Sequence, residues 1–304
     1  MEKVRPLEKI NLQKSLTLLD AKMTLDKETK QDLLNLQKGY EGEKLFNTFL
    51  EKRTHTDALI LSNLLLEVRR NTIQVDSLVI APDTVYLYEI KNYSGTYKME
   101  DGILYTLSGF EVDNPIYQLD RTKSRLRQLF QQWRLPLKIE ASIVFVHPQF
   151  VLYNADPKDP IMLHSQIEKH LDKVNPKGRP ILNRHRYVAH KLMEAIIDEA
   201  PYQKQLPSFT YEELKKKPRC PTCYFSEWRL TQRSSTCLSC LSKITIEELV
   251  IQQVEDFKLL FPDKRVTRNS IHDWCGGVIP DRRIQIILRN NYKKRGLTSG
   301  TLYL

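Results

Sequence analysis

The fold is decided by two strand-like runs, Gln74-Val-Asp-Ser-Leu-Val-Ile80 and Tyr86-Leu-Tyr-Glu-Ile-Lys-Asn92, which a short turn joins. A turn centred on Pro82 and Asp83 places Asp76 opposite Glu89 in a simple hairpin register. Two carboxylates that face each other across a strand pair repel, and a divalent cation between them would remove that cost. Strand alternation puts Lys91 on the same face as Glu89. This pattern predicts a metal site with an adjacent lysine.

Such a set of side chains has the chemistry that phosphodiester hydrolysis needs. The phosphate is negatively charged and repels a nucleophile, and a carboxylate-held Mg²⁺ neutralises it and acidifies a bound water. A nearby lysine can position that water or stabilise charge in the transition state. Because carboxylate oxygens are hard ligands, we expect Mg²⁺ or Mn²⁺ at this site rather than zinc.

The overall composition is that of a globular protein with a polyanionic partner. The 304 residues carry a formal net charge of +10, which favours nucleic acid as the partner. The alternative is that the lysines only solvate the surface. No apolar run long enough for a membrane span and no signal-peptide core are seen, so we expect a cytoplasmic protein.

The apolar pattern predicts a compact α/β core. Asp101-Gly102 is a strong two-residue turn signal, and Asn114 followed by Pro115 marks a helix start. Gly39 and Gly42 indicate either a close approach of the backbone or a helix that starts near Gly39. The predicted elements are a helix at 26–52, strands at 58–66, 73–80 and 84–91, a hairpin at 96–107, a helix at 115–133 and a strand at 139–147. A strand at 161–163 and helices at 166–173 and 184–200 follow.

Four sequence motifs of this region occur together in one known family. They are Gly39-Tyr-Glu-Gly-Glu43, Gln74-Val-Asp76, Glu89-Ile-Lys-Asn-Tyr-Ser-Gly95 and Asn114-Pro-Ile-Tyr-Gln118. In this order they resemble the nuclease-related domain (NERD), a bacterial branch of the PD-(D/E)xK nuclease superfamily. The resemblance covers roughly residues 35–150. One position departs from the wider superfamily, since Val75 stands where proline is usual.

The resemblance implies a restriction-endonuclease-like core, a mixed sheet flanked by helices. It also implies that Asp76 and Glu89 ligate the metal and that Lys91 is the catalytic lysine. Glu43 would complete the acidic set from the first helix, and Gln118 would reach the site from the second. Each residue also has a plain alternative as a solvated surface side chain. Asp76 is the hardest to explain in that way, because it lies within an apolar run.

Four cysteines form two Cys-x-x-Cys pairs separated by thirteen residues: Cys220 with Cys223, and Cys237 with Cys240. Without an export signal this spacing favours a metal over disulfides. Four thiolates complete a closed, structural Zn²⁺ site, and the segment resembles a zinc ribbon such as those of bacterial topoisomerases. Whether the ribbon grips nucleic acid or is only a small metal-stabilised module is left open.

The C-terminal segment is basic and helical. A helix is predicted after Thr267, a break at Gly276-Gly277 and a second helix from about Asp281 to Lys294. This pattern resembles a helix-turn-helix, and a plain helical cap on the ribbon is the alternative. Ser299–Leu304 could add a short strand. The candidate nucleic-acid ligands are Arg282, Arg283, Arg289, Lys293, Lys294 and Arg295.

These patterns predict a metal-dependent nuclease that acts on DNA, with modules downstream that hold the substrate. The alternative is a non-catalytic nucleic-acid-binding protein with a vestigial nuclease site. The predicted segments are a helical extension at 1–34, the nuclease domain at 35–200, a linker at 201–218, the ribbon at 219–243 and the basic helical module at 244–304.

Overall fold

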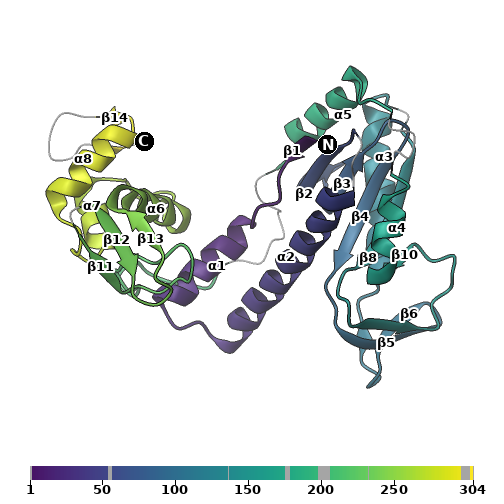
Figure 1. Ribbon diagram of the computed structural model, residues 1–304, viewed down its shortest axis with the longest axis horizontal. Helices are drawn as coiled ribbons and strands as arrows, with labels where there is room; N and C mark the ends of the chain where they lie inside the picture. Colours follow the sequence, from purple (N-terminus) through teal and green to yellow (C-terminus); the bar gives the residue numbers. More distant parts are fainter. Residues whose placement is uncertain are drawn as a thin grey trace. The chain divides into compact units, whose positions relative to one another are not determined.

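The computed structural model describes residues 2–53, 57–135, 137–174, 179–197, 206–231, 233–295 and 302–303. The chain divides into two compact units, Met1–Lys9 with Asn35–Gln203 and Ile10–Leu34 with Lys204–Leu304 (Figure 1). The first contains a mixed sheet with helices. The second contains a small antiparallel sheet with the four cysteines, and several helices. The predicted fold class is confirmed.

The first unit is organised around a six-stranded mixed sheet in the order β1-β2-β3-β4-β8-β10. Strands β2, β3 and β4 are antiparallel, whereas β1, β8 and β10 each pair in parallel with a neighbour. The central strands are buried on both faces and are rich in Val, Ile and Leu, as such strands are. The strands are β1 (Glu2–Arg5), β2 (Leu59–Val68), β3 (Asn71–Ile80), β4 (Val85–Lys91), β8 (Ile139–Phe145) and β10 (Ile161–Leu163).

Helices cover both faces of this sheet. On one face, Phe46 and Leu50 of α2 (Lys27–Arg53) and Ile167 of α4 (Ile167–Leu171) join one buried cluster; the short 3₁₀ turn η1 (His164–Gln166) precedes α4. On the other face, Leu126 of α3 (Pro115–Gln132) and Leu192 of α5 (Asn183–Glu194) belong to a second cluster. Each buried side chain of this kind contributes roughly 1.5–3 kcal/mol relative to exposure. The sheet is therefore held between two helical layers.

A second, four-stranded sheet in the order β7-β6-β5-β9 follows β4 directly. Its hairpin turns at Asp101 (φ 49°) and Gly102 (φ 76°), and positive φ at both residues is the geometry of a type I′ turn. The predicted hairpin is confirmed, and the neighbouring strands β7 and β9 were not predicted. The strands are β5 (Gly95–Glu100), β6 (Ile103–Thr106), β7 (Glu111–Val112) and β9 (Phe150–Tyr153).

The start of α3 is set by its capping residue, as the sequence predicts. The side chain of Asn114 accepts a hydrogen bond from the backbone N–H of Ile116 at 2.9 Å, and Pro115 is the first helical residue. An N-cap of this kind stabilises a helix by about 1 kcal/mol. The cap fixes where Gln118 emerges from the first turn.

Gly42 and Gly39 in α2 differ sharply in their surroundings. A Cβ at Gly42 would lie 2.6 Å from the Cβ of Asn92 and 3.3 Å from Val146, whereas a Cβ at Gly39 would meet nothing within 4 Å. Of the two alternatives for these glycines, the close backbone approach applies at Gly42, and the helix begins well before Gly39, at Lys27.

We expect Gly42→Ala to lower the free energy of unfolding by about 1–3 kcal/mol. Gly39→Ala should raise it by up to about 1 kcal/mol. Thermal unfolding of the two variants checks this pair, and equal effects would contradict it.

The second unit combines a three-stranded sheet with four helices among its described residues. Helix α6 (Ile246–Leu260) was not predicted as a separate helix. It begins with a full capping box, in which the side chains of Thr245 and Glu248 each accept a hydrogen bond from the other's backbone N–H. Its elements are α1 (Asn11–Lys22), β11 (Trp228–Leu230), β12 (Ser234–Cys237), β13 (Lys243–Thr245), α6 (Ile246–Leu260), α7 (Arg268–Trp274) and α8 (Asp281–Asn291), with the two-residue strands β14 (Lys294–Arg295) and β15 (Leu302–Tyr303).

Two predicted helices were too long. Helix α5 ends at Glu194 because Ile196 forms a β-bridge with Leu66; residues 198–200 of the predicted helix lie outside the described residues. Helix α8 ends at Asn291, because Lys294 and Arg295 pair with β15 instead. Of the predicted strand at 299–304, only residues 302–303 are described.

The N-terminal residues contribute to both units. Glu2–Arg5 is the edge strand β1 of the large sheet, whereas α1 belongs to the second unit. There the ammonium of Lys22 donates to the carbonyls of Lys215 at 3.2 Å and Lys217 at 2.9 Å and lies 3.9 Å from the ring centroid of Trp274. Burial lowers the pKa of this ammonium to about 8.

The predicted domain boundaries at 34, 200, 218 and 243 stay predictions. None of the described helices has both the length and the apolar character that a membrane crossing requires.

Candidate functional site

The candidate site begins where strands β3 and β4 stop pairing. Their ladder runs from Ile80↔Val85 to Ser77↔Tyr88, which confirms the predicted turn register. One residue further along this register, Asp76 lies opposite Glu89. Asp76 Oδ2 accepts the backbone N–H of Ile90 at 2.8 Å. A carboxylate thus takes the role that a backbone carbonyl has within the ladder, and the two acids lie at the point where the strands separate.

Lys91 and Gln118 extend the site from the face that α3 covers. The ammonium of Lys91 donates to Glu89 Oε1 at 2.8 Å and to Gln118 Oε1 at 3.0 Å. Glu89 is only 3% exposed, and the pair is therefore well shielded from solvent. These two contacts hold the lysine at a fixed position beside the carboxylates. The structure thus brings together four of the five predicted residues through direct contacts or strand register.

Glu43 reaches this group from the opposite face, on α2. Gly42 allows the helix to approach the end of β4, and the side chain of Asn92 donates to the carbonyl of Lys38 at 2.8 Å. Glu43 is partly buried and close enough to Glu89 for the two charges to interact. All five predicted site residues therefore lie in one neighbourhood. The anchoring role of Asn92 was missed, although that residue lies inside one of the motifs used for the resemblance.

The electrostatics of this neighbourhood disfavour its negative charges. Burial, together with the charge of Glu89, raises the pKa of Glu43 to about 7. Burial and the charges of Glu89 and Glu43 raise the pKa of Asp76 well above its usual value, and burial also raises that of Glu89. Burial lowers the pKa of Lys91, but Glu89 outweighs this and raises it overall. Lys91 interacts with two of the three carboxylates, Asp76 and Glu89, and Glu43 adds a third near Glu89. This donor set suits a divalent cation.

The three carboxylates do not converge as tightly as the thiolates described below. Among the described residues, only the four cysteines form a group of three or more metal ligands whose atoms all lie within 4.8 Å of one another. The ion pair with Lys91 turns one oxygen of Glu89 towards the ammonium.

Replacing Glu43 by glutamine should stabilise the protein when no divalent cation is added. Glu43 has a folded-state pKa of about 7 against 4.5 for an ordinary glutamate, so the folded state holds its proton more tightly. The free energy of unfolding therefore falls as the pH rises from 4.5 to 7. Above pH 7 the full cost of an ionised Glu43 in the folded state applies. We expect Glu43→Gln to be more stable than the parent by about 1–2 kcal/mol at pH 8 and by little at pH 5.

Thermal unfolding at several pH values measures this difference. Glu41→Gln is the matched control, because Glu41 is exposed on the same helix, and it should leave the curve unchanged. A Glu43→Gln protein whose stability follows that of the parent at every pH would contradict the expectation.

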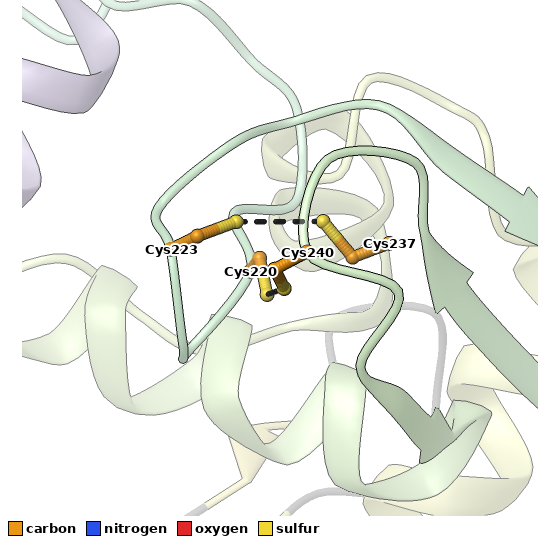
Figure 2. Close-up of side chains that lie close together, drawn as sticks. All are labelled: Cys220, Cys223, Cys237 and Cys240. Atoms are coloured by element: carbon orange, nitrogen blue, oxygen red, sulfur yellow. Dashed lines mark hydrogen bonds between the residues drawn. The ribbon is translucent and has the colours of Figure 1, made fainter.

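The four cysteines form a compact cluster in the second unit (Figure 2). The sulfur atoms of Cys220 and Cys240 are 3.7 Å apart, and those of Cys223 and Cys237 are 3.5 Å apart. Four sulfurs about 2.3 Å from one tetrahedral ion would be separated by about 3.8 Å. The arrangement is consistent with a zinc ribbon, as the sequence predicts.

The backbone around the cysteines also suits thiolate ligands. The sulfur of Cys220 accepts backbone hydrogen bonds from Thr222 and Cys223, and that of Cys237 accepts them from Ser239 and Cys240. Both Cys-x-x-Cys turns thus direct two amide N–H groups at their first sulfur. Cys275, in contrast, is fully buried outside the cluster, as predicted for a small apolar residue.

The basic residues predicted to bind nucleic acid belong to the second unit, and all six are exposed. Helix α8 buries Ile284, Ile287 and Leu288 and presents its charges to solvent, and it packs with α6 and α7. Arg219, directly before the first cysteine of the ribbon, is buried instead. It is 9% exposed and forms a salt bridge with Asp256 at 2.5 Å, because the ribbon packs against α6.

Comparison with known families decides the assignment of the first unit. Residues 38–146 match the family model of the nuclease-related domain. The chain carries a nuclease-related domain. The matched segment contains Glu43, Asp76, Glu89, Lys91 and Gln118, and the resemblance drawn from the sequence is confirmed. No curated protein and no solved structure matches the chain.

Proposed function

We propose that this protein is a metal-dependent nuclease that hydrolyses phosphodiester bonds in DNA. The observation that carries the proposal is the grouping of Asp76, Glu89 and Lys91 at the end of the β3–β4 ladder. The nuclease-related domain that contains them supports a nucleic-acid substrate.

The side chains divide the work by charge and position. A divalent cation, Mg²⁺ or Mn²⁺, held by Asp76 and Glu89 would neutralise the phosphate and acidify a water molecule. Glu89 keeps the pKa of Lys91 above its ordinary value, so the lysine is an ammonium at neutral pH. It therefore serves to stabilise developing negative charge rather than to remove a proton. Gln118 holds the ammonium in place, and Glu43 adds negative charge on the metal side.

The second unit supports substrate binding in this proposal. We assign a structural Zn²⁺ to Cys220, Cys223, Cys237 and Cys240, whose closed set leaves no position for substrate. The exposed cations of α8, of β14 and of the link between them would contact backbone phosphates (Arg282, Arg283, Arg289, Lys293, Lys294 and Arg295).

Cleavage of labelled substrates tests the proposal directly. The full-length protein is incubated with linear, circular, branched and single-stranded DNA and with RNA, with Mg²⁺, with Mn²⁺ and without added metal. We expect metal-dependent cleavage of at least one DNA. If every substrate stays intact while nucleic acid is still bound, the protein is a non-catalytic binder with a vestigial site.

A further inference from the structure

A basic pocket of about 280 Å³ lies beside α2 in the first unit. Its walls come from three separate elements: the N-terminal strand and the residues after it, one side of α2, and the start of β2. The cations Lys3, Arg5 and Lys44 line it, and Glu51 is the only acid among its lining residues. The pocket therefore carries an excess of two positive charges at neutral pH. An anion is the ligand that this charge favours.

The donors in the pocket suit the oxygens of a phosphate group. Arg5 Nε donates to the carbonyl of Ser62 at 3.1 Å, which fixes the base of the guanidinium and leaves its terminal nitrogens for a ligand. A guanidinium fork matches two phosphate oxygens. The side chain of Lys44 is exposed. The hydroxyls of Tyr40 and Thr48 and the amide of Asn47 also line the pocket.

One contact inside the pocket competes with a ligand only weakly. Lys3 pairs with Glu51 at 2.6 Å, and both side chains are 48% exposed. An exposed pair of this kind contributes at most about 1 kcal/mol. Lys3 can therefore turn from Glu51 to a phosphate at small cost.

The position of the pocket relates it to the acidic site. Asn47 lies four residues beyond Glu43 on the same side of α2, a rise of about 6 Å. A strand of nucleic acid with one phosphate at the acidic site would place another, a few nucleotides away, near the pocket. The buried carboxylates repel the backbone they act on, and a cationic pocket next to them offsets that repulsion.

We propose that this pocket binds a backbone phosphate of the nucleic acid, a few nucleotides from the bond that is cut. The inference rests on the proposed function, because it assumes that a polynucleotide reaches Glu43. It adds to that proposal a second anchoring point within the first unit, separate from the basic residues of the second unit.

Binding without cleavage tests the pocket. A fluorescent DNA oligonucleotide is titrated with full-length Glu89→Gln protein, without added divalent cation, at several salt concentrations. Lys44→Ala in this background should weaken binding about 3- to 10-fold and reduce the salt slope by about 1, as the loss of one phosphate contact does. Lys44→Glu should weaken it further. Lys52→Ala, an exposed lysine on the same helix that does not line the pocket, should leave both quantities unchanged.

The outcomes separate this inference from the proposed function. Unchanged affinity and salt slope in Lys44→Ala and in Arg5→Gln, with the fold intact by circular dichroism, would overturn the pocket even if the wild type cleaves DNA. If Lys44→Ala reduces the salt slope but the wild type cleaves no substrate, the phosphate-binding pocket is supported and the proposed nuclease activity is rejected. Inorganic phosphate provides the remaining arm. If it stabilises the wild type but not Lys44→Glu, while DNA binding is the same in both, the site takes a free anion and the proposal is wrong.

Discussion

Replacing Lys91 by alanine is expected to lower the rate of DNA cleavage by at least about 100-fold, the usual effect of losing one preorganised group that stabilises transition-state charge. The ammonium donates to Glu89 at 2.8 Å and to Gln118 at 3.0 Å, and neither contact supplies a replacement cation once the lysine is gone. Substrate binding should persist, because the proposed phosphate contacts lie elsewhere. Cleavage rate and oligonucleotide affinity, measured on the same preparation, separate the two effects.

The chain offers a matched control for this variant. Lys98 also pairs with a glutamate two residues away on a strand, Glu100, at 2.7 Å, yet it lies outside the group around Glu89. Lys98→Ala should leave the cleavage rate within about twofold of the parent, as exposed ion pairs contribute little. Glu89→Gln, which keeps the shape of the side chain, should be as inactive as Lys91→Ala. Cleavage by Lys91→Ala at the parental rate would remove the lysine from the mechanism.

The sequence predicted the parts of this site that depend on strand geometry. The turn at Pro82-Asp83 fixes the register, and alternation then places Glu89 and Lys91 on one face. Asn114 and Pro115 likewise fix the first turn of α3, from which Gln118 emerges. The position of Glu43 came only from the family resemblance. Helix periodicity cannot show which residue of a 27-residue helix meets a strand end.

The features that sequence reasoning missed depend mostly on distant contacts. Strand β1 is four residues long, and only its parallel pairing with β2, more than fifty residues away, brings Lys3 and Arg5 beside α2. Strand β9 was missed for a similar reason, since its partner β5 is distant in sequence. Helix α6 is a different case. Its capping box of Thr245 and Glu248 and its apolar face are local signals, and they are sufficient to predict this helix from the sequence.

Because we assign a structural zinc to the four cysteines, replacing Cys220 by serine should abolish zinc binding and unfold the ribbon. Cys220 and Cys237 are fully buried, and the strands around them are only three or four residues long, too short to form a stable core without metal. In zinc-finger peptides the binding of a structural Zn²⁺ contributes about 10–16 kcal/mol to the free energy of folding. Loss of one of the four ligands removes much of this stabilisation. We expect about one zinc per chain in the parent and close to none in Cys220→Ser.

Metal analysis and tryptophan fluorescence together test this expectation, because two tryptophans report on the second unit. Trp228 pairs with Cys237 in the ribbon sheet, and Trp274 is buried on α7, whereas Trp133 belongs to the first unit. The emission of the first two should shift towards that of exposed tryptophan in Cys220→Ser. Cys275→Ala is the matched control, since that thiol is equally buried but outside the cluster. It should keep its zinc and lose about 1–2 kcal/mol of stability. Full zinc content in Cys220→Ser would show that these thiolates do not hold the ion, and equal zinc loss in Cys275→Ala would point to general unfolding as its cause.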